Sequence, residues 1–375
     1  MPYPNAQDSV DELEKAYDQL VKQLPACSRD ESSRGLTLYG FLQNDSASSE
    51  FCRLLDRCPR LVSLLQDTTQ EHTIFLPANE YWRQEHRLRE AAWGDAEDLI
   101  SLHLSPHYVT TEGLLHMPNV PTLLNPAGLN GPQIIRARAS GSRWELNSAS
   151  HIVAGNIICS NGVIHRTDRP LVLAPNLMDV LEVNGLRLFR TAIKRVSDGE
   201  GDAVFPSNSK GGTVFAPADD AFAKLGRPTV QFLFETEAGL PYLRALVQVH
   251  LVPDLTFFSN FIWPQNNTGG RQTSKDEPRT IKGRIRRVLP TMLKDTSAAG
   301  EAVTSDVTIV RYNCVISMYV NGRANVVQHD LAANDGVVQV LDEVLSPGDR
   351  KVVQDGEGEV SLERFKDLLA PFLGI

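Results

Sequence analysis

The sequence predicts two copies of one domain that contains both strands and helices, because three motifs occur twice in the same order. The first motif reads TIFLPANEYW at 73–82 and TVFAPADDAF at 213–222. Its β-branched and aromatic run suits a buried strand. Pro77 and Pro217 end that strand, because proline cannot donate a hydrogen bond to a ladder. Each copy is therefore expected to contain a core strand that stops at a proline corner.

Asn79 and Asp219 follow the two corners, where a helix is expected to begin. Asparagine and aspartate are favoured N-cap residues, because the side-chain oxygen accepts hydrogen bonds from free backbone N–H groups. The aromatic residues Tyr81, Trp82 and Phe222 are then expected to fold back onto the core. Because the two copies differ at Trp82, this residue is also a candidate for specific binding.

Two further motifs complete the repeat. The second motif reads LISLHLSPH at 99–107 and LVQVHLVPD at 246–254. The third motif reads NGVIHRTDR at 161–169 and DGVVQVLDE at 335–343. The second motif aligns His103 with His250. The Asn-Gly and Asp-Gly pairs of the third motif are strong signals for two-residue hairpin turns, in which both central residues need positive φ. Each copy is therefore expected to end with a β-hairpin.

The segments around the motifs are predicted from their periodicity. Residues 8–24 place apolar side chains on one helical stripe and acids in the first turn, which predicts an amphipathic helix. Helices are expected again at 36–65, with a break near Pro59, and at 176–196. The stretch 360–373 is predicted to form a last helix, with leucines and phenylalanines on one side.

These elements divide the chain into a series of units. Residues 1–35 hold the N-terminal helix and a loop, 36–175 the first domain, and 176–347 the second domain. The second domain carries an insertion at about 257–294, and 348–375 is a tail with a helix. Since almost no linker separates the domains, they are expected to pack together with limited relative motion.

Composition indicates a globular protein and argues against some classes. The 375 residues are 42% hydrophobic and 22% charged, with a formal net charge of −9. This charge argues against a general nucleic-acid binder. No apolar run approaches the length that spans a bilayer.

Cysteines and terminal segments bear on the compartment. The five cysteines form neither a disulfide framework nor a zinc-ligand spacing, and an oxidised pair is expected, if anywhere, among Cys27, Cys52 and Cys58. Sequons at Asn44 and Asn266 are candidates for glycosylation. The first residues lack an apolar signal region, so either the protein is cytoplasmic or the sequence starts at a mature N-terminus. The last residues lack the hydrophobic tail of a lipid-anchor signal.

The three motifs, in this order, resemble the fasciclin domain twice over. TVFAPADDAF resembles the first box of that family, and TIFLPANEYW is a variant of it. The segments around His103 and His250 match the family's tyrosine-histidine motif in part, since neither has tyrosine at the matching position. NGVIHRTDRPLVLAP and DGVVQVLDEVLSP resemble the second box. The resemblance covers about residues 36–347.

This resemblance implies an α+β fold with two fasciclin-like domains packed in tandem, each a β-sandwich or wedge flanked by helices. It also implies an extracellular or wall-associated protein that binds another protein or a glycan, as adhesion proteins do. Some fungal fasciclin proteins resemble accessory components of secondary-metabolite pathways, beside laccase-type oxidases that couple aromatic polyketides. The family has no shared catalytic machinery, so the fold is a weak guide to activity.

Histidines are the obvious polar candidates. His103 and His250 act either as acid/base or partner contacts, or as hydrogen-bonded residues that fix a helix-to-strand corner. We favour the corner, because two domains rarely share one active site. His107 follows His103 by four residues, as metal ligands do, but a proline interrupts the helix and no third ligand is evident, so no metal is expected. Strand alternation predicts that His165 is exposed, and it breaks the symmetry between the copies.

The predicted insertion offers two further binding candidates. Phe258, Phe261 and Trp263 either line a pocket or partner surface for an aromatic ligand, or belong to the core. Arg286 belongs to a basic cluster that either binds an acidic partner or glycan, or pairs with local acids.

Two functional hypotheses follow. The first is a secreted or wall-associated glycoprotein that binds a protein or glycan partner in an adhesion role. The second is an enzyme or auxiliary component of a fungal secondary-metabolite pathway that holds an aromatic polyketide, with a laccase-type oxidase as its partner. No GxSxG, HExxH, P-loop or GxGxxG motif occurs in a fitting context, so catalysis stays open and no cofactor is expected.

Overall fold

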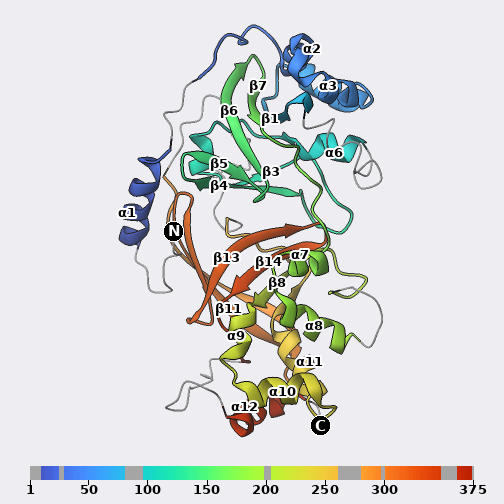
Figure 1. Cartoon of the computed structure of the whole chain (residues 1–375), viewed down its shortest axis with the longest axis vertical. Coiled ribbons are helices and arrows are strands. Elements are labelled where there is room, and N and C mark those ends of the chain that lie inside the picture. The colour runs from blue at the N-terminus through green and yellow to red at the C-terminus, as the bar shows by residue number, and fades with distance from the viewer. Residues whose placement is uncertain are drawn as a thin grey trace.

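The computed structural model describes residues 10–24, 29–80, 96–197, 204–260, 280–296, 300–347 and 361–373. Within these ranges the chain forms two seven-stranded sheets, each accompanied by short helices (Figure 1). The first sheet uses strands from the N-terminal half of the chain, and the second uses strands from the C-terminal half. The fold is therefore α+β with two tandem domains, as the sequence predicts.

The first sheet has the strand order β2-β1-β7-β6-β5-β4-β3. Its strands are β1 (His72–Pro77), β2 (Leu104–Ser105), β3 (Asn119–Pro121), β4 (Ile134–Ser140), β5 (Arg143–Leu146), β6 (Ser150–Cys159) and β7 (Gly162–Thr167). The accompanying helices are α2 (Leu38–Asn44), α3 (Ser49–Leu55), α4 (Pro59–Gln66) and α6 (Ala96–Leu102). In Figure 1, α2 and α3 lie at the end of the molecule far from the second sheet.

The second sheet has the order β10-β11-β12-β13-β14-β8-β9. Its strands are β8 (Gly212–Pro217), β9 (Leu251–Pro253), β10 (Lys282–Lys294), β11 (Ala302–Tyr312), β12 (Val315–Val320), β13 (Ala324–Ala333) and β14 (Gly336–Leu341). The helices are α7 (Leu177–Val183), α8 (Arg187–Val196), α9 (Asp219–Ala223), α10 (Arg227–Glu235), α11 (Leu240–Val249) and α12 (Leu362–Leu369). The edge strands β9 and β10 pack against each other, so the sheet curls into a wedge.

The two proline-corner strands occupy equivalent places in the two sheets. β1 pairs in parallel with β7, and β8 pairs in parallel with β14. All six residues of β1 and all six of β8 are buried. Pro77 and Pro217 are the last residues of these strands, as predicted. Each domain is thus built on the same pairing between its first and third motifs.

The hairpins of the third motif are present, but the predicted turn type is wrong. The two residues between β6 and β7 are 160–161, and neither Asn161 nor its counterpart Asp335 has positive φ. Glycine is needed for a different reason. A Cβ atom on Gly162 would lie 2.1 Å from the carbonyl oxygen of His72, so the backbone of the neighbouring strand leaves no room for a side chain.

The side chains of Asn79 and Asp219 each accept a hydrogen bond from the start of a neighbouring helix. The backbone N–H of Glu50, at the start of α3, donates to Asn79 Oδ1 at 2.9 Å. The N–H of Leu188, at the start of α8, donates to Asp219 Oδ1 at 2.9 Å. The predicted cap of the following helix is wrong, because Ala218 is the N-cap of α9 and Asp219 is already helical. Each corner therefore fastens a neighbouring helix to the sheet.

The N-terminal helix α1 (Val10–Val21) contacts both domains. Leu13 is fully buried against Val310 of β11 in the second sheet. One turn further on, Tyr17 packs against Tyr312 with ring centroids 5.3 Å apart. Leu20 packs against the apolar core of the first domain. The helix thus forms a bridge across the outside of the two domains, which Figure 1 shows at the left.

Two further predictions are modified, and a third is tested only for one pair of cysteines. The predicted helix 176–196 is two helices, α7 and α8, separated at Gly185, where φ is 73°. The described part of the predicted insertion includes β10, which is an edge strand paired with β11, with a register shift between Pro290 and Lys294. Cys52 and Cys58 are buried and not joined to each other, and Cys27 lies outside the described residues.

Candidate functional site

The aligned histidines His103 and His250 are buried corner residues. His103 lies between α6 and β2, and His250 lies between α11 and β9. Nδ1–H of His103 donates to the carbonyl of Leu99 at 2.8 Å, and its Nε2 accepts from the N–H of Leu171 at 2.9 Å. His250 makes the same two bonds, with Leu246 at 2.7 Å and Leu345 at 2.9 Å.

These bonds define the protonation state of both rings. Burial lowers the pKa of His103 and of His250 to about 4, because the charged imidazolium would lose its hydration. At neutral pH both rings are therefore neutral, with the proton on Nδ1. Since both ring nitrogens already bond the backbone, neither ring is placed for acid/base chemistry. This is the arrangement that the corner interpretation predicts.

His165 is buried, so the prediction that it is exposed is wrong. Five of the six residues of β7 are buried, so both faces of this strand are covered and alternation along it does not lead to solvent. The N–H of Asn156 donates to His165 Nδ1 at 3.3 Å, and Nε2–H donates to the carbonyl of Val109 at 2.7 Å. Burial lowers its pKa to about 4. His165 is thus a structural residue of the first domain.

Of the other predicted site residues, Phe258 and Arg286 are described, and each has neighbours of its own. Phe258 is buried between the domains, where it packs with Ile134 and Val337. Arg286 forms an ion pair with Asp306, which is the alternative of pairing with a local acid. Trp82, Phe261, Trp263 and Asn266 lie outside the described residues.

His107 and Asn44 each take part in a hydrogen bond. The carbonyl of His107 accepts a bond from Thr73 Oγ1 at 2.7 Å. Asn44 is exposed at the end of α2, and its amide donates to the carbonyl of Gly40 at 2.8 Å.

Across the described ranges, no three His, Cys, Asp or Glu side chains are grouped as a metal site. No helix among these residues is long and apolar enough to cross a membrane.

A pocket of about 270 Å³ lies where α1 and the two domains meet, and we call it the interdomain pocket. Arg136 and Arg138 of β4 line it from the first domain. They alternate with alanines along the strand and therefore share one face. Ile316 of β12 and Asp330 of β13 line it from the second domain. The pocket is thus assembled from both domains.

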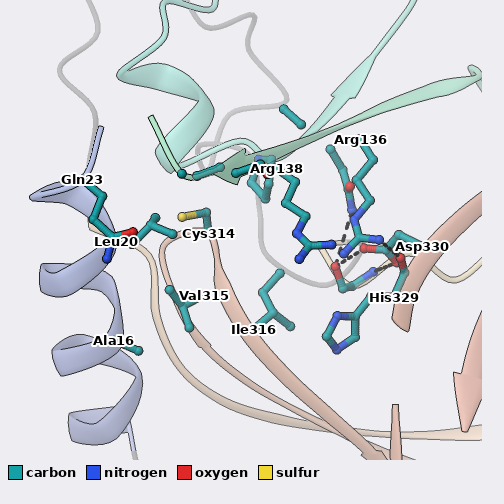
Figure 2. A pocket seen from close by; sticks show the side chains of 17 residues that line it. Ala16, Leu20, Gln23, Arg136, Arg138, Cys314, Val315, Ile316, His329 and Asp330 are labelled. Atoms are coloured by element: carbon teal, nitrogen blue, oxygen red, sulfur yellow. Dashed lines mark hydrogen bonds between the residues drawn. The ribbon is translucent and has the colours of Figure 1, made fainter. Parts of the chain in front are cut away.

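The pocket has an apolar side and a charged side. Figure 2 shows Ala16 and Leu20 of α1 at one side and Arg136 and Asp330 at the other. Ile316 lies between them, together with its neighbours on β12. Such a division predicts a ligand with an apolar body and a polar end.

Asp330 anchors the charged side. It is only 3% exposed, and its carboxylate accepts bonds from Ser259 N–H at 2.8 Å, Asn119 Nδ2 at 2.9 Å and Gln339 Nε2 at 2.8 Å. Burial opposes ionisation, but nearby Arg136 and these hydrogen bonds outweigh it and hold the pKa of Asp330 below its usual range. Asp330 is therefore ionised at neutral pH, and its charge is satisfied by fixed donors.

The remaining charges of the pocket follow from their neighbours. Burial, with the positive charges of Arg136 and Arg138, lowers the pKa of His329 to about 4, so this ring is neutral at neutral pH. Burial also raises the pKa of the Cys314 thiol to about 12. The lining residues then carry two positive charges and the one negative charge of Asp330, which leaves one net positive charge.

Two contacts next to the pocket hold the domains together. Arg311 is only 1% exposed, and its Nη2 donates to the carbonyl of His116 in the first domain at 2.7 Å. Arg136 Nη1 donates to the carbonyl of His329 in the second domain. Both guanidinium groups therefore reach across the domain boundary, and the pocket walls are positioned by these contacts.

The sequence contains one local signal for this site. The stretch IIRARAS at 134–140 places two arginines on one face of a strand. Asp330 and Ile316 gave no local signal, because their roles depend on contacts with the other domain.

A model of the family described as "Fasciclin domain" matches residues 46–173 and 187–347. Aurofusarin biosynthesis cluster protein S of Gibberella zeae is 29% identical over 238 residues, which cover 61% of this chain and 57% of that protein. Periostin of Homo sapiens is 25% identical over 307 residues, which cover 80% of this chain and 31% of periostin. The chain thus spans only part of the length of these relatives.

Two further comparisons with known proteins were found. A fasciclin-like arabinogalactan protein of Arthroderma benhamiae is 34% identical over 114 residues, which cover 28% of this chain and 26% of that protein. The solved structure of a domain pair from the insect cell adhesion molecule Fasciclin I is 17% identical. That match covers 80% of this chain and 97% of the solved chain, with a TM-score of 0.37.

Proposed function

This chain belongs to the fasciclin family, and on that basis we propose that it is a binding protein that holds a small aromatic molecule in the interdomain pocket. The observation that carries the proposal is the pocket itself, in which two arginines face an apolar wall at the boundary of the domains. Its volume of about 270 Å³ lies just below the usual range for ligand pockets, which is roughly 300–1,000 Å³. A compact ring system suits this space.

A role in a fungal secondary-metabolite pathway is the biological setting that we propose. The relative from Gibberella zeae has a name that assigns it to an aurofusarin biosynthesis cluster. By similarity, we infer that this chain is an auxiliary component that presents an aromatic polyketide to a laccase-type oxidase. Deleting its gene is expected to change the profile of aromatic metabolites, and an unchanged profile would contradict this setting.

Binding is tested directly by titrating the purified chain with 2-naphthol and 2-naphthoate, two compact aromatic probes. Both are expected to bind. An Ala16→Trp variant fills the pocket from α1 and is expected to weaken binding at least about tenfold, or about 1.4 kcal/mol. Lys15→Trp is the matched control, because Lys15 is the preceding residue of the same helix and is exposed.

The outcomes separate clearly. Binding that survives in Lys15→Trp and is lost in Ala16→Trp supports the interdomain pocket as the site. Binding that is equal in both variants places the ligand elsewhere, and binding of neither probe by the unmodified chain contradicts the proposal. Equal thermal unfolding of the two variants is the control for intact docking of α1.

A protein or glycan partner is the second candidate function, in a secreted or wall-associated setting. The match to periostin over 80% of this chain and the match to a fasciclin-like arabinogalactan protein favour it. The purified chain would then be retained on a glycan array or by a cell surface. If the chain binds 2-naphthoate but no glycan or cell surface at low salt, the partner-binding function is contradicted and only the small-molecule function remains.

A further inference from the structure

The interdomain pocket carries a specific charge pattern, and this pattern restricts its ligand. Four donor groups satisfy the carboxylate of Asp330, namely the N–H and hydroxyl of Ser259 and the amides of Asn119 and Gln339. A carboxylate that is held in this way has little capacity left for a ligand donor. The negative charge of the pocket is therefore a structural charge.

The two arginines of the pocket differ in their surroundings. Arg136 is half-buried and donates to the carbonyl of His329, and its charge lowers the pKa of Asp330. Arg138 is exposed on the same strand face, two residues further along β4. Figure 2 shows the Arg138 side chain extending from β4 toward Ile316 and His329. The guanidinium of Arg138 thus lies at the meeting point of the charged and apolar sides.

Two titratable groups lie near Arg138, namely Glu145 and His329. Glu145 lies directly opposite Arg138 in the β4–β5 register, so its side chain is on the same face of the sheet. A guanidinium has five N–H donors, and one carboxylate uses at most two of them at a time. A neighbouring glutamate therefore leaves Arg138 able to bind a second anion. His329 is neutral at neutral pH and does not compete for that anion.

We propose that Arg138 binds the acidic group of the ligand, so that the interdomain pocket selects a monoanionic aromatic molecule over a neutral one of the same shape. This inference rests on the proposed function. The ring system would lie against Leu20 and Ile316, and the carboxylate or ionised phenol would lie at Arg138.

The test uses two probes of nearly identical shape, 2-naphthoate and neutral 2-naphthamide. The unmodified chain is expected to bind 2-naphthoate at least about tenfold more tightly, which is within the range for a charge-assisted hydrogen bond. In Arg138→Gln, a polar group remains but the charge is lost. Affinity for 2-naphthoate is then expected to fall to that for 2-naphthamide, while affinity for 2-naphthamide stays unchanged.

Arg143→Gln is the matched control. Arg143 is exposed on the adjacent strand β5 and does not line the pocket, so this variant is expected to keep the full preference for 2-naphthoate. Thermal unfolding of both variants checks that the fold is intact. The preference of the unmodified chain should also weaken as salt is added, because ions screen the exposed guanidinium.

Three results would overturn the inference. If 2-naphthoate and 2-naphthamide bind equally to the unmodified chain, the pocket does not select an anion over a neutral ligand, although the proposed function stands. If Arg138→Gln keeps the preference for 2-naphthoate, another group binds the ligand's acidic group. If neither probe binds, the proposed function fails and this inference fails with it.

Discussion

Asn156 and Asp330 occupy the same position in the two domains. Both residues have positive φ, 60° and 59°, next to an irregularity in β6 and in β13. The N–H of Asn156 donates to His165 Nδ1 at 3.3 Å, and the N–H of Asp330 donates to Gln339 Oε1 at 3.0 Å. Both acceptors lie on the facing strand. The side-chain oxygen of each accepts a backbone N–H at 2.8 Å. The hydrogen bonds repeat, and what changes between the copies is the charge.

Replacing Asp330 with asparagine tests whether that charge is needed. Ser259, Asn119 and Gln339 all donate hydrogen bonds to the Asp330 carboxylate. The NH₂ group of an asparagine would therefore face other donors and find no acceptor among them. We expect Asp330→Asn to lower the free energy of unfolding by about 3 kcal/mol, as for breaking a buried charged network. Urea denaturation measures this change.

The control for this substitution is Asp220→Asn. Asp220 is exposed in α9, so its replacement should change the free energy of unfolding by less than about 0.5 kcal/mol. If Asp330→Asn is as stable as the control, the charge of Asp330 does not hold the domain boundary together.

Acid is expected to destabilise the fold through four buried histidines, His103, His165, His250 and His329. Burial lowers the pKa of each from the ordinary 6.5 to about 4. The unfolded chain therefore takes up protons below 6.5, whereas the folded chain does so only near 4. The free energy of unfolding should fall as pH drops through this window, by up to about 3 kcal/mol for each histidine.

Urea denaturation at several pH values between about 7 and 4 checks this dependence. A variant with His250→Gln should show a shallower fall, because one of the four groups is gone. Stability that stays constant through the window would mean that the buried rings are already protonated or that solvent reaches them.

The cap made by Asp219 predicts where a substitution will act. Asp219→Ala should cost about 1 kcal/mol of stability, because the N–H of Leu188 loses its acceptor. Amide hydrogen exchange should then speed up at the start of α8 and not in α9. The neighbouring substitution Asp220→Ala is the control and should leave exchange at Leu188 unchanged. Faster exchange confined to α9 would mean that Asp219 caps α9, as the sequence predicts, and not α8.

Gly162→Ala tests the close approach of β7 and β1. The added Cβ would lie 2.1 Å from the carbonyl oxygen of His72, so one strand must move and several ladder bonds must lengthen. A loss of more than about 3 kcal/mol is expected. Gly35→Ala is the comparison, since a Cβ there meets nothing within 4 Å. A stable Gly162→Ala variant would show that the strands have room to separate.

Predictions from the sequence agreed with the structure where the chemistry is local. Pro77 and Pro217 end their strands because a missing N–H acts at the residue itself. His103 and His250 hold their corners through carbonyls four residues earlier in the same helix. Because the three motifs repeat, the two-domain architecture also followed from the sequence.

Predictions failed where the answer depends on distant segments. The prediction that His165 is exposed fails because alternation assumes one solvent-facing side, whereas five of the six residues of β7 are buried. The prediction for Asp219 fails because the position of α8 is a tertiary property. The interdomain pocket could not be predicted, because Arg138 and Asp330 are far apart in the sequence and meet only through docking of the domains.

The most direct test of the account is a methyl NMR titration of the chain with 2-naphthoate. Ile316 lies in the interdomain pocket, whereas Ile193 is buried in the core of the second domain away from the lining residues. The account predicts that the Ile316 methyl resonances shift during the titration and that those of Ile193 stay in place. A titration in which the Ile316 signals do not move would contradict a ligand site between the two domains.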